Sequence, residues 1–176
     1  MLLATGAGIG EPIDRFHSVR KHMQINGIAH VQLTVTNFKV CVDFYEKLLE
    51  YFEMKRLIKT DSVLYYIGGR TGIAISKCDE QFQNEHFEQR RIGLHHLCFR
   101  TRRREDVDEL YRFLQSIDTT IVHPPEDGPW APGYYSVLFE DPDGIRLEAN
   151  YVPGKGHLEP TATIGPAGPL GGKAGL

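Results

Sequence analysis

An internal repeat is the feature that most constrains how this chain of 176 residues can fold. Residues 26–33 (NGIAHVQL) are similar to residues 92–99 (IGLHHLCF). A second pair follows further along each copy, where residues 71–76 (TGIAIS) are similar to residues 143–148 (DGIRLE). Two similar units in one chain of this length predict a tandem of two small modules.

Each copy has the same order of predicted secondary structure. Residues 31–35 and 96–100 alternate apolar and polar side chains, which is typical of a strand. Residues 40–52 and 104–117 carry apolar side chains at helical spacing. Further strand-like segments follow each helix, so the chain is predicted to be an α+β protein with two tandem βαβββ modules.

The composition changes at both ends of the chain and predicts the domain limits. Residues 1–23 lack a clear periodicity and are predicted to form an N-terminal extension. Residues 24–153 are predicted to form the folded domain, with module one at about 24–80 and module two at about 91–153. Residues 154–176 are rich in Gly and Pro and are predicted to be a flexible tail. The Pro- and Gly-containing segment 123–133 is interpreted as a loop within module two.

One face of the predicted strands carries the groups that can do chemistry. Strand side chains alternate between the two faces of a sheet, and the apolar positions are expected to pack on the helices. The opposite face is expected to be polar, and two curled mixed sheets of this kind would form a cup. The residues predicted to line this cup are His30, Gln32, His96, Arg100, Arg146, Glu148 and Asn150.

Three of these residues are predicted to bind a metal. His30, His96 and Glu148 form a set of two imidazoles and one carboxylate that can leave coordination positions open for a substrate. The predicted cofactor is one divalent ion: Fe, Mn, Ni, Co or Zn. The alternative is that each histidine has an ordinary hydrogen-bonded role in a binding protein that kept the fold without the metal.

Other polar and aromatic residues are candidates for binding a substrate. Arg100 and Arg146 share the phase of the predicted ligands and could hold a carboxylate or phosphate, or could be solvated arginines at strand ends. Trp130 could form an aromatic lid with Tyr134 and Tyr135, or could be a hydrophobic plug or dimer contact.

The overall composition excludes some classes of partner. The formal net charge of −3 does not favour binding to nucleic acid or to an anionic membrane surface. No apolar run approaches the length needed to span a membrane, and the N-terminus lacks the basic region of a secretory signal. The three cysteines are scattered, which suits a reducing compartment. We therefore expect a cytoplasmic protein with a small-molecule substrate.

Four segments together resemble the vicinal oxygen chelate superfamily, which includes glyoxalases, bleomycin-resistance proteins and ring-cleaving dioxygenases. The segments are INGIAHVQLTV, FYEKLL, GLHHLCFR and LFEDPDGIRLE, and the resemblance covers about residues 24–153. It implies paired βαβββ modules, a divalent metal on His30, His96 and Glu148, and pairing of modules between chains in a homodimer. The fourth ligand of glyoxalase I, a glutamate ending the first module, falls on Ser76 in this chain.

The resemblance implies a metal-dependent enzyme that chelates two neighbouring oxygen atoms of a small, anionic substrate, with lyase or isomerase chemistry. Glu148 is predicted to be a catalytic residue as well as a ligand, and Ser76 is predicted to line the substrate site. Glu140 is a candidate general base. An extradiol dioxygenase is one alternative, although Leu138 occupies the position where such relatives usually carry a tyrosine. An antibiotic thiol transferase and a non-catalytic antibiotic-binding protein are the others.

Overall fold

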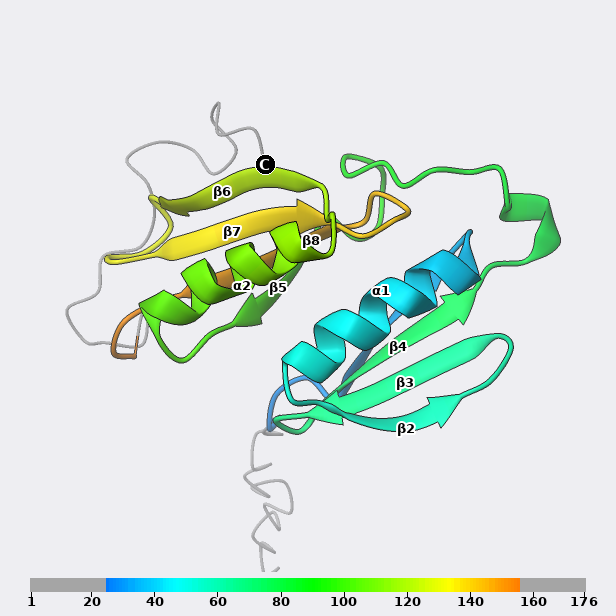
Figure 1. The fold of residues 1–176 in the computed structure, drawn as a ribbon, viewed down its shortest axis with the longest axis horizontal. Helices are drawn as coiled ribbons and strands as arrows, with labels where there is room; N and C mark the ends of the chain where they lie inside the picture. Colours follow the sequence, from blue (N-terminus) through cyan, green and yellow to red (C-terminus); the bar gives the residue numbers. More distant parts are fainter. Residues whose placement is uncertain (1–24, 156–176) are drawn as a thin grey trace, which may run out of the picture.

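The structure is a computed structural model that describes residues 25–155 and contains two βαβββ modules (Figure 1). The predicted order of elements is therefore confirmed. The predicted extension 1–23 lies outside the described residues, as does the predicted tail from residue 156 onward. Module one comprises β1 (His30–Val35), α1 (Phe38–Tyr51), β2 (Lys55–Lys59), β3 (Val63–Gly68) and β4 (Thr71–Lys77). Module two, after a short 3₁₀ helix η1 (Glu80–Phe82), comprises β5 (Leu97–Arg100), α2 (Arg104–Ser116), β6 (Ile121–Asp127), β7 (Tyr135–Glu140) and β8 (Arg146–Tyr151).

Both modules build the same mixed sheet. The strand order is β1-β4-β3-β2 in module one and β5-β8-β7-β6 in module two. The first and last strands of each module pair in parallel, whereas the remaining neighbours are antiparallel. Each sheet is curled and not closed, so β1 and β5 remain edge strands (Figure 1).

The apolar face of each sheet packs against its own helix, as the alternation predicts. Leu33 and Val35 of β1 and Ile75 of β4 are at most 5% exposed, while Gln32 and Thr34, on the opposite face of β1, are exposed. Helix α1 contributes Tyr45 and Leu48, both with no exposed surface. Burial of each such side chain stabilises the fold by about 1.5–3 kcal/mol, which explains why the helices cover this face and leave the other open.

The segment interpreted as a loop at 123–133 is in part a strand, which corrects the prediction. Strand β6 runs to Asp127 and pairs with β7 through two register irregularities around His123 and Glu126. Prolines are tolerated here because β6 is the outer strand of its sheet, where an amide N–H facing away from the sheet has no partner to lose. The loop proper covers only residues 128–134.

The two modules are joined by polar contacts from the Asp-Pro-Asp-Gly turn before β8. Asp143 accepts hydrogen bonds from the amide N–H and the hydroxyl of Thr36 and, at 3.4 Å, from the amide N–H of Asn37, the N-cap residue of α1. Asp141 accepts a hydrogen bond of 2.9 Å from the hydroxyl of Tyr45 in the middle of α1. Module two is therefore joined to module one by the two residues that precede α1 and by Tyr45 within the helix.

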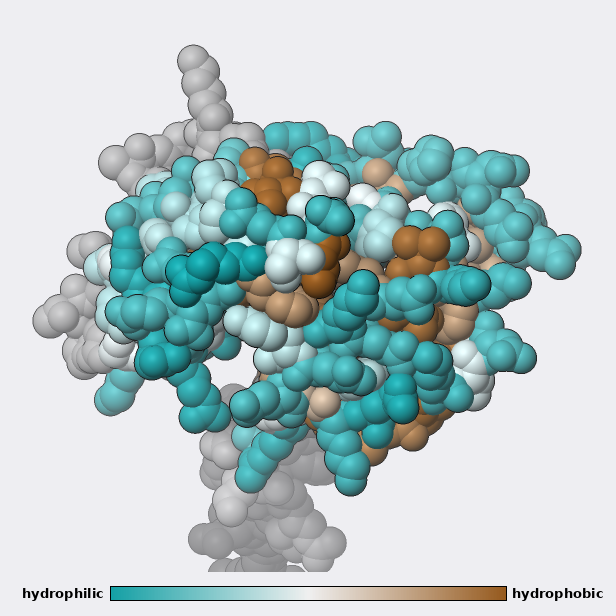
Figure 2. All heavy atoms as spheres, viewed as in Figure 1, coloured by the Kyte–Doolittle hydropathy of each residue, from teal (hydrophilic) through white to brown (hydrophobic). Residues whose placement is uncertain are grey.

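Aromatic contacts join the modules at the other end of α1. Tyr51 stacks on Phe113 of α2 with ring centroids 4.0 Å apart and planes 7° apart, and Phe52 lies 5.0 Å from Phe99 of β5. On the face shown in Figure 2 the surface is mostly hydrophilic, with hydrophobic side chains in separate groups. None of the helices in residues 25–155 combines the length and the apolar character needed to cross a membrane.

Candidate functional site

Two of the three predicted metal ligands lie in contact in module two. Glu148 is in β8, and His96 immediately precedes β5, the strand that pairs with β8 in parallel. The register places Cys98 opposite Glu148 and brings the His96 side chain to the same face. His96 Nε2 lies 3.2 Å from Glu148 Oε2. The alternation that assigned these residues to one face is therefore consistent with their positions.

The carboxylate of Glu148 is buried and held in its ionised form. Only 5% of the residue is exposed. Burial acts to raise the pKa of Glu148, but hydrogen bonds from His96, Tyr134 and Ser136 outweigh it and hold the pKa below its usual range. An ionised carboxylate is the form that binds a divalent metal.

His95 contacts the far side of the His96 ring. The two Nδ1 atoms are 2.8 Å apart, and the rings meet edge to face at 72°. Such a contact needs a proton on only one of the two nitrogens. If Nε2 of His96 gives its lone pair to a metal, its Nδ1 carries the proton. This Nδ1–H then donates a hydrogen bond to His95, which fixes the orientation of the His96 ring.

Tyr134 is a candidate site residue whose position differs from the one predicted from the sequence. The sequence predicts an aromatic lid, a hydrophobic plug or a dimer contact there, but the hydroxyl of Tyr134 donates a hydrogen bond of 2.6 Å to Oε1 of Glu148. The signal that could have found it is the alternation of β7, because Ser136 and Leu138 pair with Asn150 and Glu148 on the open face and Tyr134 continues that phase. The prediction of a loop at residues 123–133 does not use this alternation.

The remaining candidates of module two differ in how available their polar groups are to a substrate. Asn150 pairs in register with Arg100, which is exposed at the end of β5. Arg146 instead forms an ion pair with Glu140, with Nε 2.9 Å from Oε1. This pairing engages both the predicted anion-binding arginine and the candidate general base, which leaves Arg100 as the more available cation.

The candidates of module one lie together on the open face of the other sheet. Gln32 donates a hydrogen bond of 2.6 Å from Nε2 to the hydroxyl of Ser76, so the two side chains share one face as the repeat indicated. His30 is the first residue of β1 and is exposed. Within residues 25–155 no group of three His, Cys, Asp or Glu side chains is close enough to hold a metal ion. His30 therefore does not join His96 and Glu148 within one chain, and the three-residue ligand set stays a prediction.

The spacing of the pair in module two nevertheless fits a divalent ion. Two ligands at about a right angle around one ion, with bonds of about 2.1 Å, lie about 3 Å apart. The distance of 3.2 Å between His96 Nε2 and Glu148 Oε2 is close to this value. Both atoms are of the kinds that Zn, Fe, Mn, Co and Ni accept.

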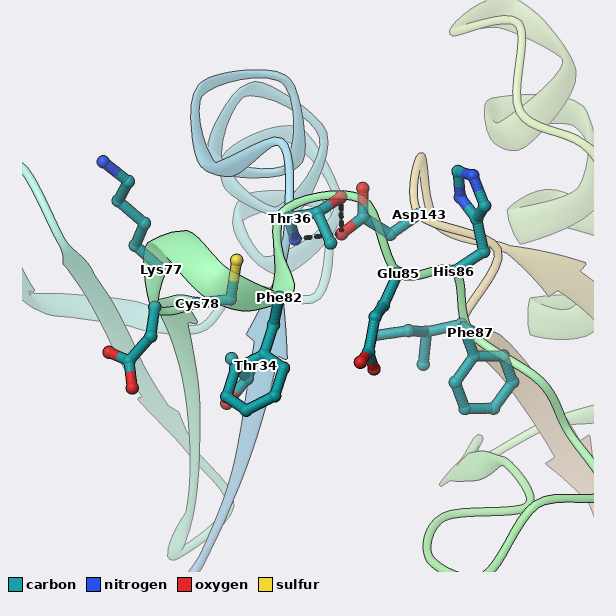
Figure 3. Close-up of a pocket in the computed structure, with 11 residues that line it drawn as sticks. Thr34, Thr36, Lys77, Cys78, Phe82, Glu85, His86, Phe87 and Asp143 are labelled. Atoms are coloured by element: carbon teal, nitrogen blue, oxygen red, sulfur yellow. Dashed lines mark hydrogen bonds between the residues drawn. The ribbon is translucent and has the colours of Figure 1, made fainter.

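A cavity lies away from this pair, at the junction of the two modules. Its volume is about 470 Å³, and it is bordered by the ends of β1 and β4, the segment after β4, and the turn that carries Asp143 (Figure 3). Figure 3 shows Thr36 hydrogen-bonded to Asp143 beside the cavity, with Lys77 and His86 on the surrounding segments. A smaller neighbouring cavity of about 300 Å³ is lined in part by Gln32. No role is predicted from the sequence for residues 78–87, which line part of these cavities.

Comparison with known proteins agrees with the fold. The family model for the Glyoxalase/Bleomycin resistance protein/Dioxygenase superfamily matches residues 27–149. Protein YqjT of Bacillus subtilis, described as uncharacterized, is 27% identical over 123 residues, which cover 68% of this chain and 94% of YqjT.

Solved structures show the same architecture. A crystal structure from Bacillus halodurans superposes with a TM-score of 0.64 at 28% identity, covering 72% of this chain and 96% of that one. A glyoxylase/bleomycin resistance protein/dioxygenase domain from Frankia sp. EAN1pec gives a TM-score of 0.60 at 26% identity, covering 73% and 98%. Lactoylglutathione lyase from Agrobacterium tumefaciens shares the fold, with a TM-score of 0.55 at 20% identity over 73% and 95%. By this match over most of its described length, the chain belongs to the glyoxalase/bleomycin resistance protein/dioxygenase superfamily.

Proposed function

We propose that this protein is a divalent-metal-dependent enzyme that chelates two neighbouring oxygen atoms of a small, anionic substrate and carries out lyase or isomerase chemistry. The observation that carries the proposal is the contact of His96 Nε2 with Glu148 Oε2 at 3.2 Å, between an imidazole and a buried, ionised carboxylate. The ion is one of Fe, Mn, Ni, Co or Zn.

The third ligand, in this proposal, is His30 of the partner subunit in a homodimer. Two observations support this arrangement. His30 is exposed on β1, an edge strand, and His96 directly precedes β5, the corresponding edge strand of module two. An edge strand presents unpaired backbone groups that a second chain can cover. Because the pair in module two lacks a third ligand from its own described chain, a dimer that apposes β1 and β5 would complete the site.

The residues around the site have separate tasks in the proposed reaction. The bound metal supplies positive charge that stabilises an oxyanion on the substrate. Glu148 would hold the metal and, as an ionised carboxylate, could exchange a proton with a substrate oxygen. Arg100 provides an exposed cation for the anionic group of the substrate, and Asn150 beside it offers an amide. Gln32 and Ser76 would complete the substrate site from the other module, with Trp130 near its rim.

The register of β7 and β8 makes an extradiol dioxygenase the weaker candidate. Leu138 pairs directly with Glu148 and is 4% exposed. The position at which ring-cleaving relatives usually carry a tyrosine is thus a buried apolar residue beside the predicted ligand. A proton-transferring phenol is missing from that position.

Metal analysis of matched histidine variants tests the proposal. The wild-type protein, reloaded with Co²⁺ or Zn²⁺ and desalted, should hold about one ion per chain by elemental analysis. His96→Ala should hold less than a tenth of that, because a ligand is lost. His123→Ala, which changes a histidine on β6 outside the predicted ligand set, should retain full occupancy. Full occupancy in His96→Ala, or an empty wild type, would refute the metal assignment.

Activity and assembly follow as a second stage of the same test. Substrates that present two neighbouring oxygens should be screened: thiol adducts of α-ketoaldehydes, acyl-CoA thioesters and catechols. Turnover of the first two classes supports lyase or isomerase chemistry, whereas oxygen-dependent turnover of catechols alone would overturn it. Sedimentation should show a dimer, and a monomer that binds metal at full occupancy would exclude a ligand from the partner subunit.

A further inference from the structure

Oε1 of Glu148, the oxygen that does not face His96, has its own donor. Tyr134 donates its hydroxyl to Oε1 at 2.6 Å, while Oε2 is the atom that lies 3.2 Å from His96. The length is that expected of a hydroxyl donating to an ionised carboxylate, which is the stronger class of hydrogen bond. The two oxygens of one carboxylate are therefore used differently, and only one of them faces the predicted metal position.

Tyr134 is held by contacts of its own loop, none of which involves a metal. Tyr134 is 9% exposed. Its backbone closes the loop on both sides, because its N–H donates to the carbonyl of Ala131 and its carbonyl accepts from the N–H of Gly128, each at 3.0 Å. A Cβ on Gly128 would lie 2.7 Å from the Tyr134 ring and 3.2 Å from Trp130, so the glycine allows the loop to pack directly on the tyrosine. A hydroxyl held this firmly restricts the rotation of the carboxylate that it contacts.

We propose that Tyr134 is a positioning residue that occupies Oε1 of Glu148 and thereby makes Glu148 a one-oxygen ligand through Oε2. This inference rests on the proposed metal dependence of the site and goes beyond it by assigning a role to a residue outside the ligand set. A carboxylate bound through one oxygen leaves one more coordination position than a carboxylate bound through two. A substrate that chelates through two oxygens needs that position.

The experiment compares two adjacent tyrosines that each donate to a carboxylate. Tyr134→Phe removes the hydroxyl from Glu148 and keeps the packed ring. Tyr135→Phe is the matched control, because its hydroxyl donates at 2.7 Å to Asp108 on α2, away from the site. Both variants and the wild type are titrated as full-length chains with Co²⁺, and the dissociation constant and the visible absorption of the bound ion are measured. Far-ultraviolet circular dichroism of the metal-free proteins verifies that each variant is folded.

The proposal predicts a change in both readouts for one variant only. Loss of a group that orients a ligand typically weakens metal binding by about 10–100-fold, so the dissociation constant of Tyr134→Phe should rise by at least tenfold. Its Co²⁺ absorption should change in intensity as the coordination of the carboxylate changes. Tyr135→Phe should match the wild type within about twofold, with the same spectrum.

The opposing outcomes separate this inference from the proposed function. If Tyr134→Phe binds Co²⁺ like the wild type with the same spectrum, Tyr134 does not position the ligand. If both tyrosine variants lose affinity equally, or if Tyr134→Phe loses affinity with an unchanged spectrum, the effect is general destabilisation and the inference is overturned. A wild-type protein that takes up no Co²⁺ would instead refute the metal dependence itself, and this inference with it.

Discussion

Asp141 should make the stability of the protein depend on pH in a way that one substitution removes. The residue is 4% exposed, and all three donors to its carboxylate come from within the protein: Tyr45 to Oδ2, and the amides of Ile145 and Asp143 to Oδ1. Burial outweighs these donors and raises the pKa of Asp141 from its ordinary value of 3.8 to about 6.

The sign and size of the effect follow from that pKa. The folded state holds the proton of Asp141 more tightly than the unfolded state does, so the free energy of unfolding falls as the pH rises from 3.8 to about 6. The difference between these two values corresponds to about 3 kcal/mol. In Asp141→Asn the amide cannot ionise. Its Oδ1 can still accept from both backbone amides and its Nδ2 can donate to the hydroxyl of Tyr45. The variant should therefore lose this pH dependence without losing its hydrogen bonds.

Urea denaturation at several pH values between 4 and 7 measures the effect. The quantity to compare is the difference in the free energy of unfolding between Asp141→Asn and the wild type, because contributions from other carboxylates cancel in it. This difference should move by about 2.4 kcal/mol in favour of the variant over that range, because part of the full change lies below pH 4. Asp43→Asn, an exposed aspartate on α1, is the control and should differ from the wild type by less than about 0.5 kcal/mol throughout. A difference for Asp141→Asn that is constant with pH would refute the reasoning.

Three further predictions concern polar residues of the two modules. Ser76→Glu places a carboxylate next to Gln32, on the face where the repeat aligns Ser76 with Glu148; a titration with Co²⁺ should show tighter binding than in the wild type, and unchanged binding would place Ser76 away from the metal. Arg100→Gln should raise the KM for an anionic substrate by about tenfold with little change in kcat, because it removes an exposed cation. Arg146→Gln should instead lower the free energy of unfolding by at most about 1 kcal/mol, since it breaks a partly exposed ion pair with Glu140.

The repeat and the strand alternation were enough to predict much of module two from the sequence. The period-two pattern assigns a side chain to one face of a strand, and the parallel pairing of β5 with β8 then brings His96 and Glu148 together. The same pattern cannot say how one sheet faces another, because that depends on the packing of whole modules. The position of His30 relative to the other predicted ligands was therefore beyond the reach of alternation alone.

Residues in irregular segments were harder to place. Pro124 and Pro125 favour a loop, but an edge strand with register irregularities accommodates them. The prediction of a loop also does not use the strand alternation that directs Tyr134 toward Glu148. The walls of the cavity at residues 78–87 have no periodicity to interpret. In both cases the position of a side chain is set by contacts that are distant in the sequence.

Asp143 also bears on how the chain can fold as it is synthesised. The residue lies 107 positions after Thr36, yet it accepts hydrogen bonds from the amide N–H groups of Thr36 and Asn37 at the start of α1. Helix α1 has no acidic residue in its own first turn, so the negative charge that favours a helix N-terminus comes from module two. A ribosome that has produced only module one has made a helix that carries its Asn37 cap but lacks the carboxylate of Asp143 at its N-terminus. The contacts at the start of α1 are then completed only by the last third of the chain, so we expect the two repeats to fold in a single cooperative step.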